Sequence, residues 1–396
     1  MVQDGAKERV TARAMSAGEK TRWICERARE LGFDLCGVAS AALVGASAEL
    51  VKRLPEWLDA GYAGQMEYLH DERRSDPALA LEGARSVVMV ALNYNAERPH
   101  STDAGVYESA DGAPRGWISR YAWGDDYHKV LWAKLNALVA AMKAEWGESF
   151  GVDARADSGP VLERVVAKYA GLGWQAKNTC LINQELGSWM FLGTILTTLD
   201  LEPTLAERDP PTPDLCGSCM LCLDACPTQA FVAPYVLDAR KCISYLTIEL
   251  HGAIPLEFRE PMGHALIGCD ICQDVCPWNR KAPVTKLAQF QPRTVDVRAA
   301  TETEPAVTAE LMAPEVEWIA SLTQAEFSRI FTRSAVKRPK LRGLMRNACV
   351  ALGNAKLQRG SAVYERIVAL LERLSASEDS LIAEHAQWAL ARLRGR

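Results

Sequence analysis

The 396-residue sequence predicts a mixed α+β (α/β) N-terminal domain, a small cysteine-rich module and an all-α C-terminal domain. Three observations predict this fold class. Helix-periodic segments and strand-like apolar runs alternate through the first half of the chain. Most of the cysteines gather between residues 216 and 276, and helical patterns dominate beyond residue 309. Because a chain of this length is long for a single core, two or three domains are expected.

Hydrophobic periodicity predicts the main elements of the N-terminal domain. Apolar residues at helical spacing predict helices over residues 19–32 and 127–146. Continuous apolar runs rich in β-branched residues predict strands over residues 86–94 and 190–199. Alternation of these helices and strands gives the domain its α+β character.

A proline-rich segment, DPPTPD at residues 209–214, marks the end of the N-terminal domain. The predicted domains are therefore 1–208, 209–285 and 286–396, and the last begins with a polar connector. Within the helical tail, apolar residues near 344–352 recur at an offset of 38 residues. Such a period suggests HEAT-like paired helices, which repeat at about 40 to 47 residues. An unrelated cap of three or four helices is the alternative.

Composition restricts the classes of protein to which the chain can belong. A net charge of -5 at pH 7 argues against indiscriminate nucleic-acid binding, although a local basic surface is compatible with it. The sequence has neither a long apolar run for a membrane span nor an apolar export signal, so a cytoplasmic protein with reduced thiols is expected. In such a protein, twelve cysteines point to metal binding or catalysis rather than to disulfides.

The first cysteine run, CGSCMLCLDACP at residues 216–227, has the C-x2-C-x2-C-x3-C-P spacing of bacterial ferredoxins. In that pattern three cysteines bind one iron–sulfur cluster and the fourth reaches a second cluster. Thiolates suit iron because they are soft, anionic donors. The run therefore predicts a ferredoxin-like module with two 4Fe-4S clusters and a role in electron transfer.

The second run, GCDICQDVCP at residues 268–277, is one cysteine short, because Leu266 stands where the earlier cysteine would be. Cys242 is the only unassigned cysteine between the two runs, so it can fill the vacant position. One cluster is then assigned to Cys216, Cys219, Cys222 and Cys276, and the other to Cys226, Cys242, Cys269 and Cys272. A pair of zinc sites is the alternative, but zinc ribbons lack this interleaved spacing with proline after the fourth cysteine. The remaining cysteines, Cys25, Cys36, Cys180 and Cys349, are expected to be small core residues.

A chain with two clusters and this much additional sequence is expected to carry substrate chemistry in its N-terminal domain. The most suggestive stretch is ADSGPVLERVVAKYAGLGWQAKNTCLI, residues 156–182. A helix is expected over residues 161–170 because Pro160 fits a first turn, and Asp157 just before it is either an N-terminal cap or a catalytic acid. Gly171 and Gly173 follow a helix, which is the wrong context for a dinucleotide-binding loop.

Several segments, taken together and in this order, identify a family resemblance. They are RRSDPALALEGARSVV near residue 73, WGDDYHKVL at 123, DSGPVLERVVAKYAGLGWQAKNT at 157, CISYLTIE at 242 and the two cysteine runs. The chain resembles the epoxyqueuosine reductases, cobalamin- and iron–sulfur-dependent enzymes that complete queuosine in tRNA. The resemblance covers most of the chain, and the helical tail is similar to the HEAT-like extension of that family.

The resemblance implies a base-off cobalamin held by the N-terminal domain above one cluster and reduced by the clusters to a strongly nucleophilic state. The implied substrate is the epoxide of epoxyqueuosine at the wobble position of a tRNA anticodon, which is reduced to the cyclopentene of queuosine. Asp157 occupies the proton-donor position of the family motif, and Ser119 stands at a cofactor-side position that is cysteine in some relatives. The other residues implied on the cofactor side are Arg74, Lys177, Asn178, Ile182, Ser244 and Glu249.

The chemistry of such a reduction agrees with the cofactors and the acid that the resemblance implies. Removing an epoxide oxygen takes two electrons and protons, which two clusters, a two-electron metal centre and one acid can supply. A helix start favours the ionised form of Asp157, whereas an acid must carry its proton, and burial or a neighbouring negative charge would be needed to keep it. His128 lies in a D-x-H arrangement, but Leu131 stands where histidine-on cobalamin proteins have glycine. His128 is therefore expected to be a surface residue at a helix start, which suits a base-off cofactor.

Residues 333–346, RSAVKRPKLRGLMR, carry no acidic residue although the chain is acidic overall. A local positive patch of this kind is typical of a phosphate-binding surface, and it opens the helical tail that the resemblance assigns to tRNA. A solvated helix face is the alternative. The predicted nucleic-acid contacts are Arg333, Lys337, Arg338, Lys340, Arg342 and Arg346.

The favoured function is therefore a tRNA-modifying reductase. One alternative is an enzyme like the corrinoid and iron–sulfur reductive dehalogenases, which usually begin with a twin-arginine export signal that MVQDGAKERVTARAMS lacks. The other is a non-catalytic protein for electron transfer or cobalamin handling. An external electron donor of the flavodoxin or ferredoxin type and a monomeric state are expected.

Overall fold

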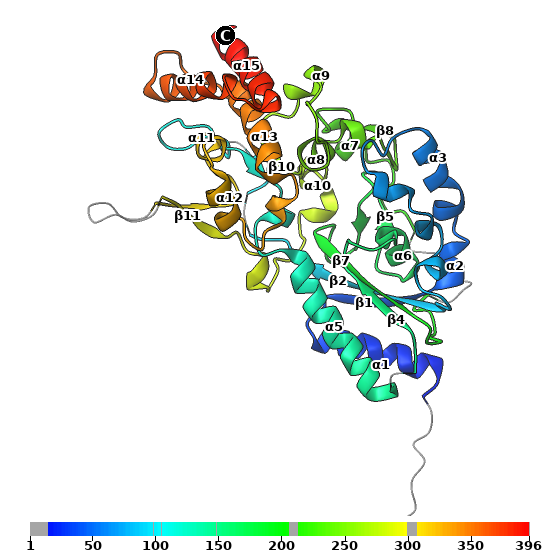
Figure 1. Ribbon diagram of the computed structural model, residues 1–396. Coiled ribbons are helices and arrows are strands. Elements are labelled where there is room, and N and C mark those ends of the chain that lie inside the picture. Colours follow the sequence, from blue (N-terminus) through cyan, green and yellow to red (C-terminus); the bar gives the residue numbers. More distant parts are fainter. Residues whose placement is uncertain are drawn as a thin grey trace, which may run out of the picture.

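The computed structural model describes residues 15–97, 99–103, 105–147, 149–205, 213–298 and 307–395 (Figure 1). The predicted domain boundary between residues 208 and 209 lies outside the described residues. None of the described helices combines the length and the apolar character that spanning a lipid bilayer requires.

The N-terminal region is built on one antiparallel sheet of four strands in the order β1-β2-β7-β4. These strands are β1 (Leu35–Ser40), β2 (Ser86–Asn93), β7 (Met190–Thr197) and β4 (Val152–Arg155). Every residue of β2 is buried, which explains why its sequence is a continuous apolar run rather than an alternation. The strands predicted over residues 86–94 and 190–199 are confirmed.

Helices cover both faces of this sheet (Figure 1). On one face lie α1 (Ala17–Glu30) and α5 (Tyr127–Trp146), which share a buried core with β2 and β7. On the other face lie α2 (Ala41–Gly45) and α6 (Glu163–Tyr169). The helices predicted over residues 19–32 and 127–146 are confirmed.

The helix expected over residues 161–170 begins later than predicted. This helix is α6. Its N-cap residue is Leu162, whose apolar side chain cannot accept a hydrogen bond from the first turn. Asp157 lies five residues before that cap, in a loop, with a left-handed φ of 55°. The chain is still bent at Val161, because a helix does not have to start at the first place that tolerates a proline. The interpretation of Asp157 as an N-terminal cap is therefore wrong.

The two cysteine runs lead into two short helices, α7 (Leu221–Asp224) and α10 (Ile271–Asp274), which pack against each other. Between them lie α8 (Ile243–Ile248), which follows Cys242, and β10 (Ala265–Ile267), which pairs in parallel with β3 (Trp117–Ile118). Leu266, at the place of the missing cysteine, is fully buried. The module is thus anchored to the N-terminal region just before its second run. The remaining short elements are α3 (Leu54–Asp59), α4 (Pro77–Ala80), β5 (Trp174–Gln175), β6 (Leu181–Ile182), β8 (Phe231–Ala233), β9 (Val236–Leu237) and α9 (Leu256–Arg259).

Helices dominate the C-terminal part of the chain, as predicted. They are α11 (Val316–Ala320), α12 (Gln324–Ile330), α13 (Lys340–Asn354), α14 (Ala362–Ser375) and α15 (Ser380–Gly395). α15 packs against both α13 and α14, so the segments related by the 38-residue offset are neighbours. The assignment of these helices to the HEAT type stays a prediction.

The region is not all-α, because its connector contains a pair of antiparallel strands. They are β11 (Thr294–Arg298) and β12 (Val307–Glu310). β-Branched residues such as Thr294, Val295 and Val297 favour extended backbone, and Val295 is buried. These short strands could not be predicted because polar residues surround them and the apolar–polar alternation covers only a few positions.

One core joins the C-terminal helices to the rest of the chain. Trp117, Ile118 and Trp123 from the N-terminal region belong to the same buried cluster as Leu344 and Leu371. Leu266 of the cysteine module belongs to it as well. The three predicted domains therefore share an interior, and their boundaries stay a prediction.

Arg346, predicted as a phosphate contact, is fully buried. Its guanidinium donates to the carbonyl oxygens of Leu246, Leu250 and Gly252 at 2.6, 2.6 and 2.8 Å. Burial lowers its pKa to about 10, and Arg342 adds to this effect. Arg346 therefore ties α13 to the end of α8, and its assignment to the nucleic-acid surface is wrong. Sequence alone could not separate a buried arginine from exposed ones in the same basic segment.

We expect Arg346→Met to lower the free energy of unfolding by about 2 to 4 kcal/mol, because several buried carbonyl oxygens lose their donor. Arg342→Met on the same helix is the control: its exposed ion pair with Asp379 should contribute no more than about 1 kcal/mol. Anaerobic chemical denaturation measures both variants. Equal effects would contradict the role of Arg346.

Candidate functional site

The four cysteines assigned to the first cluster lie together. The pKa of the Cys222 thiol is raised to about 11, first by burial and then by the neighbouring thiolates of Cys276, Cys216 and Cys219. A nearby charge shifts a pKa in this way only at short range, so these four sulfurs occupy one neighbourhood. The fold thus brings the last cysteine of the second run to the first run.

Cys226, Cys242, Cys269 and Cys272 form the second group. Burial raises the pKa of Cys269, and the thiolates of Cys242 and Cys226 add to this effect. The pKa of Cys272 is also raised, first by a hydrogen bond with Cys180 and then by burial and the thiolates around it. Cys242 is therefore placed beside the second run, where a fourth sulfur is needed. Ligation of iron by these two groups stays a prediction.

Among the described residues, no three His, Cys, Asp or Glu side chains converge on a point that could hold a single metal ion. A 4Fe-4S cluster needs no such point, because each of its four cysteines binds a different iron.

Cys180, expected to be a small core residue rather than a ligand, is half-buried and contacts the second group. Its thiol is hydrogen-bonded with Cys272, and this bond lowers the pKa of Cys180. The spacing of the two runs gave no reason to include Cys180, because it lies far upstream of both. Cys25 and Cys349 are buried, as predicted.

Lys177 and Asn178, predicted on the cofactor side, hold the loops of the cysteine groups. Lys177 is buried, and its Nζ donates to the carbonyl oxygens of Gly217 and Cys219 at 2.6 and 3.0 Å. Asn178 Nδ2 donates to the Cys272 carbonyl oxygen at 3.2 Å. Both side chains therefore fasten the segment after α6 to the cysteine module.

Ser119 and Ile182 are buried as well. Ser119 donates its hydroxyl to Asp270, and Ile182 packs in a small cluster with Cys276. Ser244 follows Cys242, and its main-chain N–H donates to the Cys242 sulfur. These predicted cofactor residues therefore contact the cysteine module.

Asp157 is the centre of a separate polar group at the starts of α5 and α6. Its side chain is 58% exposed. Tyr127, the first residue of α5, donates its hydroxyl to Asp157 Oδ2, and His128 Nε2 lies 3.7 Å from the same oxygen. The His128 Nδ1 atom is 2.8 Å from Asp126 Oδ1. His128 therefore lies near the start of α5 with a partly exposed side chain, as expected, and it also faces Asp157.

Glu163, the first residue of α6, is a member of this group that the sequence did not reveal. Its Oε1 accepts a hydrogen bond from the Asp157 main-chain N–H at 2.8 Å. Burial raises the pKa of Glu163 to about 8, and the charge of Asp157 adds to this effect. A glutamate in a first helical turn is common, so nothing in the sequence separated Glu163 from an ordinary helix-start residue.

Residues from distant segments surround the same space. Arg74 Nε donates to the Tyr68 carbonyl oxygen at 2.9 Å, and Arg338 pairs with Glu249 at 3.1 Å. The pKa of Tyr68 is raised to about 12, first by burial and then by Glu249, while Arg338, Asp157 and Arg74 also act on it. Of the residues predicted on the cofactor side, Arg74 and Glu249 are therefore those that share a site with Asp157.

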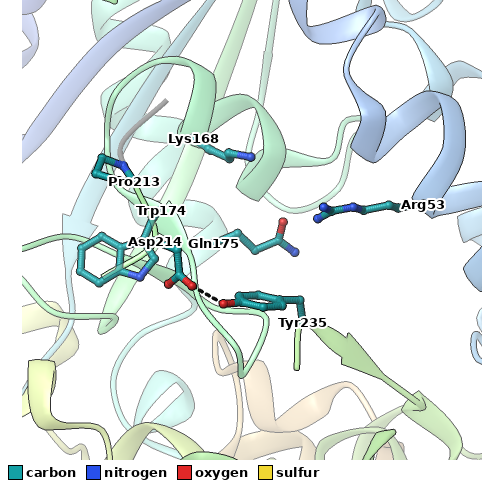
Figure 2. A pocket seen from close by; sticks show the side chains of 7 residues that line it. All are labelled: Arg53, Lys168, Trp174, Gln175, Pro213, Asp214 and Tyr235. Atoms are coloured by element: carbon teal, nitrogen blue, oxygen red, sulfur yellow. Dashed lines mark hydrogen bonds between the residues drawn. The ribbon is translucent and has the colours of Figure 1, made fainter. Parts of the chain in front are cut away.

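A cavity of about 320 Å³ lies elsewhere, beside the first cysteine group. Figure 2 shows Asp214 and Tyr235 at this cavity, joined by a hydrogen bond from the Tyr235 hydroxyl. Asp214 Oδ1 also accepts from the Cys216 main-chain N–H at 2.9 Å. The cavity is lined by Arg53, Lys168, Trp174, Gln175, Pro213, Asp214 and Tyr235. None of these residues belongs to the group around Asp157.

Comparison with known proteins assigns this arrangement to a family. Residues 215–279 match the family described as a 4Fe-4S double cluster binding domain, and residues 74–158 match the one described as epoxyqueuosine reductase QueG, DUF1730. An epoxyqueuosine reductase of Gloeobacter violaceus is 45% identical over 340 residues, covering 83% of this chain and 95% of the relative. One of Xanthomonas campestris is 40% identical and covers 92% of this chain and 93% of the relative.

The chain belongs to the epoxyqueuosine reductase family. It is therefore an oxidoreductase with an iron–sulfur module, and the alternatives of a dehalogenase-like enzyme and a non-catalytic carrier are set aside.

Solved epoxyqueuosine reductases have the same fold. One with an epoxyqueuosine-modified tRNA-Tyr stem loop has a TM-score of 0.77 and 29% identity, covering 94% of this chain and 89% of that one. The Bacillus subtilis reductase, described with the catalytic loop of an aspartate swung out of the active site, has a TM-score of 0.74 and 29% identity. It covers 94% of this chain and 90% of that one.

We expect Cys242→Ala to remove about half of the iron and sulfide, because one of two clusters loses a ligand while the other keeps four. Cys180→Ala and Cys36→Ala are controls that should keep the full content, since neither cysteine belongs to a set of four. Iron and acid-labile sulfide are measured after anaerobic purification. Unchanged iron in folded Cys242→Ala would contradict the assignment.

Proposed function

We propose that this reductase converts epoxyqueuosine to queuosine at the wobble position of tRNA anticodons, using cobalamin held beside Asp157 and electrons from two 4Fe-4S clusters. The observation that carries the proposal is the position of Asp157. Its exposed carboxyl shares a site with Glu249, at the end of the helix that follows Cys242, and with Arg338 of the basic segment. The related structure with a modified tRNA stem loop supports a tRNA substrate.

The residues around Asp157 fit a base-off cobalamin. Both ring nitrogens of His128 are directed at carboxylates, so its imidazole is not offered to cobalt. Arg74, Ser244 and Glu249 supply polar groups that would hold the cofactor on the side of the second cysteine group. Bound there, cobalamin would supply the two-electron chemistry that opens the epoxide.

The positions of the two cysteine groups indicate the order in which electrons would pass through the two clusters. Cys226 belongs to the first run but lies with the second group, so the two clusters are neighbours. The second group adjoins the Asp157 site through α8, whereas Met220 and Leu221, beside the first group, are exposed. We expect an external donor of the flavodoxin or ferredoxin type to deliver electrons there. We expect the protein to act as a monomer in the cytoplasm.

Asp157 is our proposed donor of the proton that lets the epoxide oxygen leave; bound cofactor and nucleotide would cover its exposed carboxyl, and this burial favours the protonated form. The complete reduction takes two electrons and two protons and releases the oxygen as water, so an acid must stand close to that oxygen. The hydroxyl of Tyr127 orients the carboxyl through Oδ2. The catalytic aspartate loop described for the Bacillus subtilis enzyme supports this role.

The basic segment supplies the surface for the tRNA backbone. Arg338 is 59% exposed although it pairs with Glu249, and it lies close enough to Asp157 to be affected by its charge. Phosphates contacted here would therefore flank the reacting nucleotide. With Arg346 buried, the exposed members of the segment are Arg333, Lys337, Arg338, Lys340 and Arg342.

We expect Asp157→Asn to lower single-turnover reduction by about two to four orders of magnitude, because asparagine cannot deliver a carboxylic proton. Asparagine tolerates a left-handed φ as aspartate does, so the loop should keep its shape and the protein its iron and cobalamin. Asp153→Asn, in β4, is the control and should react normally. A near-normal rate for pre-reduced Asp157→Asn would return this residue to a structural role.

Neutralising Lys337 and Lys340 together should weaken tRNA binding and reduce the log–log salt slope by about 0.7 to 0.9 for each lost phosphate contact. The matched control replaces Arg27 and Arg29 in α1, which lies at the lower end of the view in Figure 1, away from α13. Binding is measured across a salt series with full-length tRNA. An unchanged affinity and slope would remove the segment from the interface.

A further inference from the structure

We propose that Glu163 is a positioning residue that fastens the loop carrying Asp157, an inference that rests on the proposed role of Asp157 as the acid. The contact that does so is the hydrogen bond from the Asp157 main-chain N–H to Glu163 Oε1, 2.8 Å long. Glu163 itself does not need to touch the substrate. It acts through the backbone of its neighbour.

The loop requires fastening because its conformation is unfavourable by itself. Asp157 has a φ of 55°, in the left-handed region that side chains other than glycine adopt at a cost. Most of the Asp157 side chain is exposed, so burial does not fix it. Two hydrogen bonds hold the residue from opposite ends: Tyr127 donates to the carboxylate, and Glu163 accepts from the main chain. Only the second one fixes the backbone.

Glu163 is suited to this task because its own position is rigid. It is the first residue of α6, a helix that buries Val165, Val166 and Ala167 against the central sheet. Its carboxyl is therefore carried by the scaffold rather than by the loop. A functional group held by a packed helix is placed more accurately than one held by a loop alone.

The charge state of Glu163 makes the fastening dependent on pH. The groups that face it are Asp157 on the loop, Arg164 on α6 and Arg74 beside Tyr68, while Tyr127 and His128 approach Asp157 from α5. Burial and the charge of Asp157 raise the pKa of Glu163 to about 8, against an ordinary value of 4.5. At neutral pH the carboxyl is uncharged and its oxygen accepts the bond. Above pH 8 it ionises: the charged oxygen still accepts the main-chain hydrogen bond, but its repulsion from an ionised Asp157 carboxylate opposes this arrangement of the loop.

The sign of the effect on stability follows from the same shift. Between the ordinary value and about pH 8, the folded protein holds a proton on Glu163 that the unfolded chain has released. The stability contributed at this position is therefore greatest at low pH and falls as the pH rises through that interval. A glutamine at this position would remove the dependence.

Two substitutions separate the hydrogen bond from the charge. Glu163→Gln keeps a carbonyl oxygen as acceptor, whereas Glu163→Met keeps the length and removes the acceptor. Single-turnover reduction of an epoxyqueuosine-modified stem loop should fall on the order of 10- to 100-fold in the methionine variant, the range of a hydrogen bond to a charged or buried group. Its KM for tRNA should stay within about twofold, because no substrate contact is lost. The glutamine variant should react at the parent rate at pH 7 and lack the loss of rate near pH 8.

Hydrogen exchange gives a readout that does not depend on turnover. Peptides covering residues 156–162 should exchange faster in Glu163→Met and normally in Glu163→Gln, with iron content and cobalamin binding unchanged in both. Parental exchange and parental rate in the methionine variant would overturn the inference, as would equal defects in the two variants. If Asp157→Asn proves active while Glu163→Met still loosens the loop, the proposed acid fails and the fastening by Glu163 stands.

Discussion

Each of the two cysteine runs contributes one cysteine to the group formed mainly by the other run, and this interleaving constrains how the whole chain folds. Cys276 lies with the first group and Cys226 with the second, so neither group is complete until both runs have folded together. The intervening chain has to carry Cys242 into the second group through α8 and return through β10. β10 finds its partner in β3 of the N-terminal region, and α13 covers both β10 and α8. The grouping of cysteines from both runs is thereby coupled to the packing of three parts of the chain.

The same packing attaches the segment that carries Asp157 to the cysteine module. Lys177 and Asn178 follow α6 and are hydrogen-bonded to the backbones of the two cysteine groups, so the module is attached to the segment that carries Asp157. On the other side, Arg346 holds the end of α8, where Glu249 begins the polar rim of the site. Buried, fully hydrogen-bonded polar residues of this kind specify a single arrangement, because a misplaced partner would leave them unsatisfied.

Hydrophobic periodicity was sufficient to predict the regular helices and strands, and cysteine spacing predicted which cysteines lie near one another. Neither could predict features that depend on contacts between distant parts of the chain. The helix at 127–146 and the strands at 86–94 and 190–199 were predictable because each has a long uniform pattern. The start of α6, the burial of Arg346 and the contact between Cys180 and Cys272 depend on residues far away in the sequence. Glu163 could not be identified from the sequence for a related reason. Its carboxyl accepts a hydrogen bond from a main-chain N–H six residues earlier, and no pattern of side chains indicates such a contact.

In the proposed reaction, electrons from the cysteine module reach an epoxide at the Asp157 site through cobalamin. A single-turnover assay on anaerobically reconstituted, chemically reduced protein tests this, with queuosine in a modified tRNA stem loop quantified with and without cobalamin. We expect close to one queuosine per cobalamin-loaded protein and none in the absence of cobalamin. Equal product without cobalamin, or no product from protein carrying both clusters and cobalamin, would contradict it.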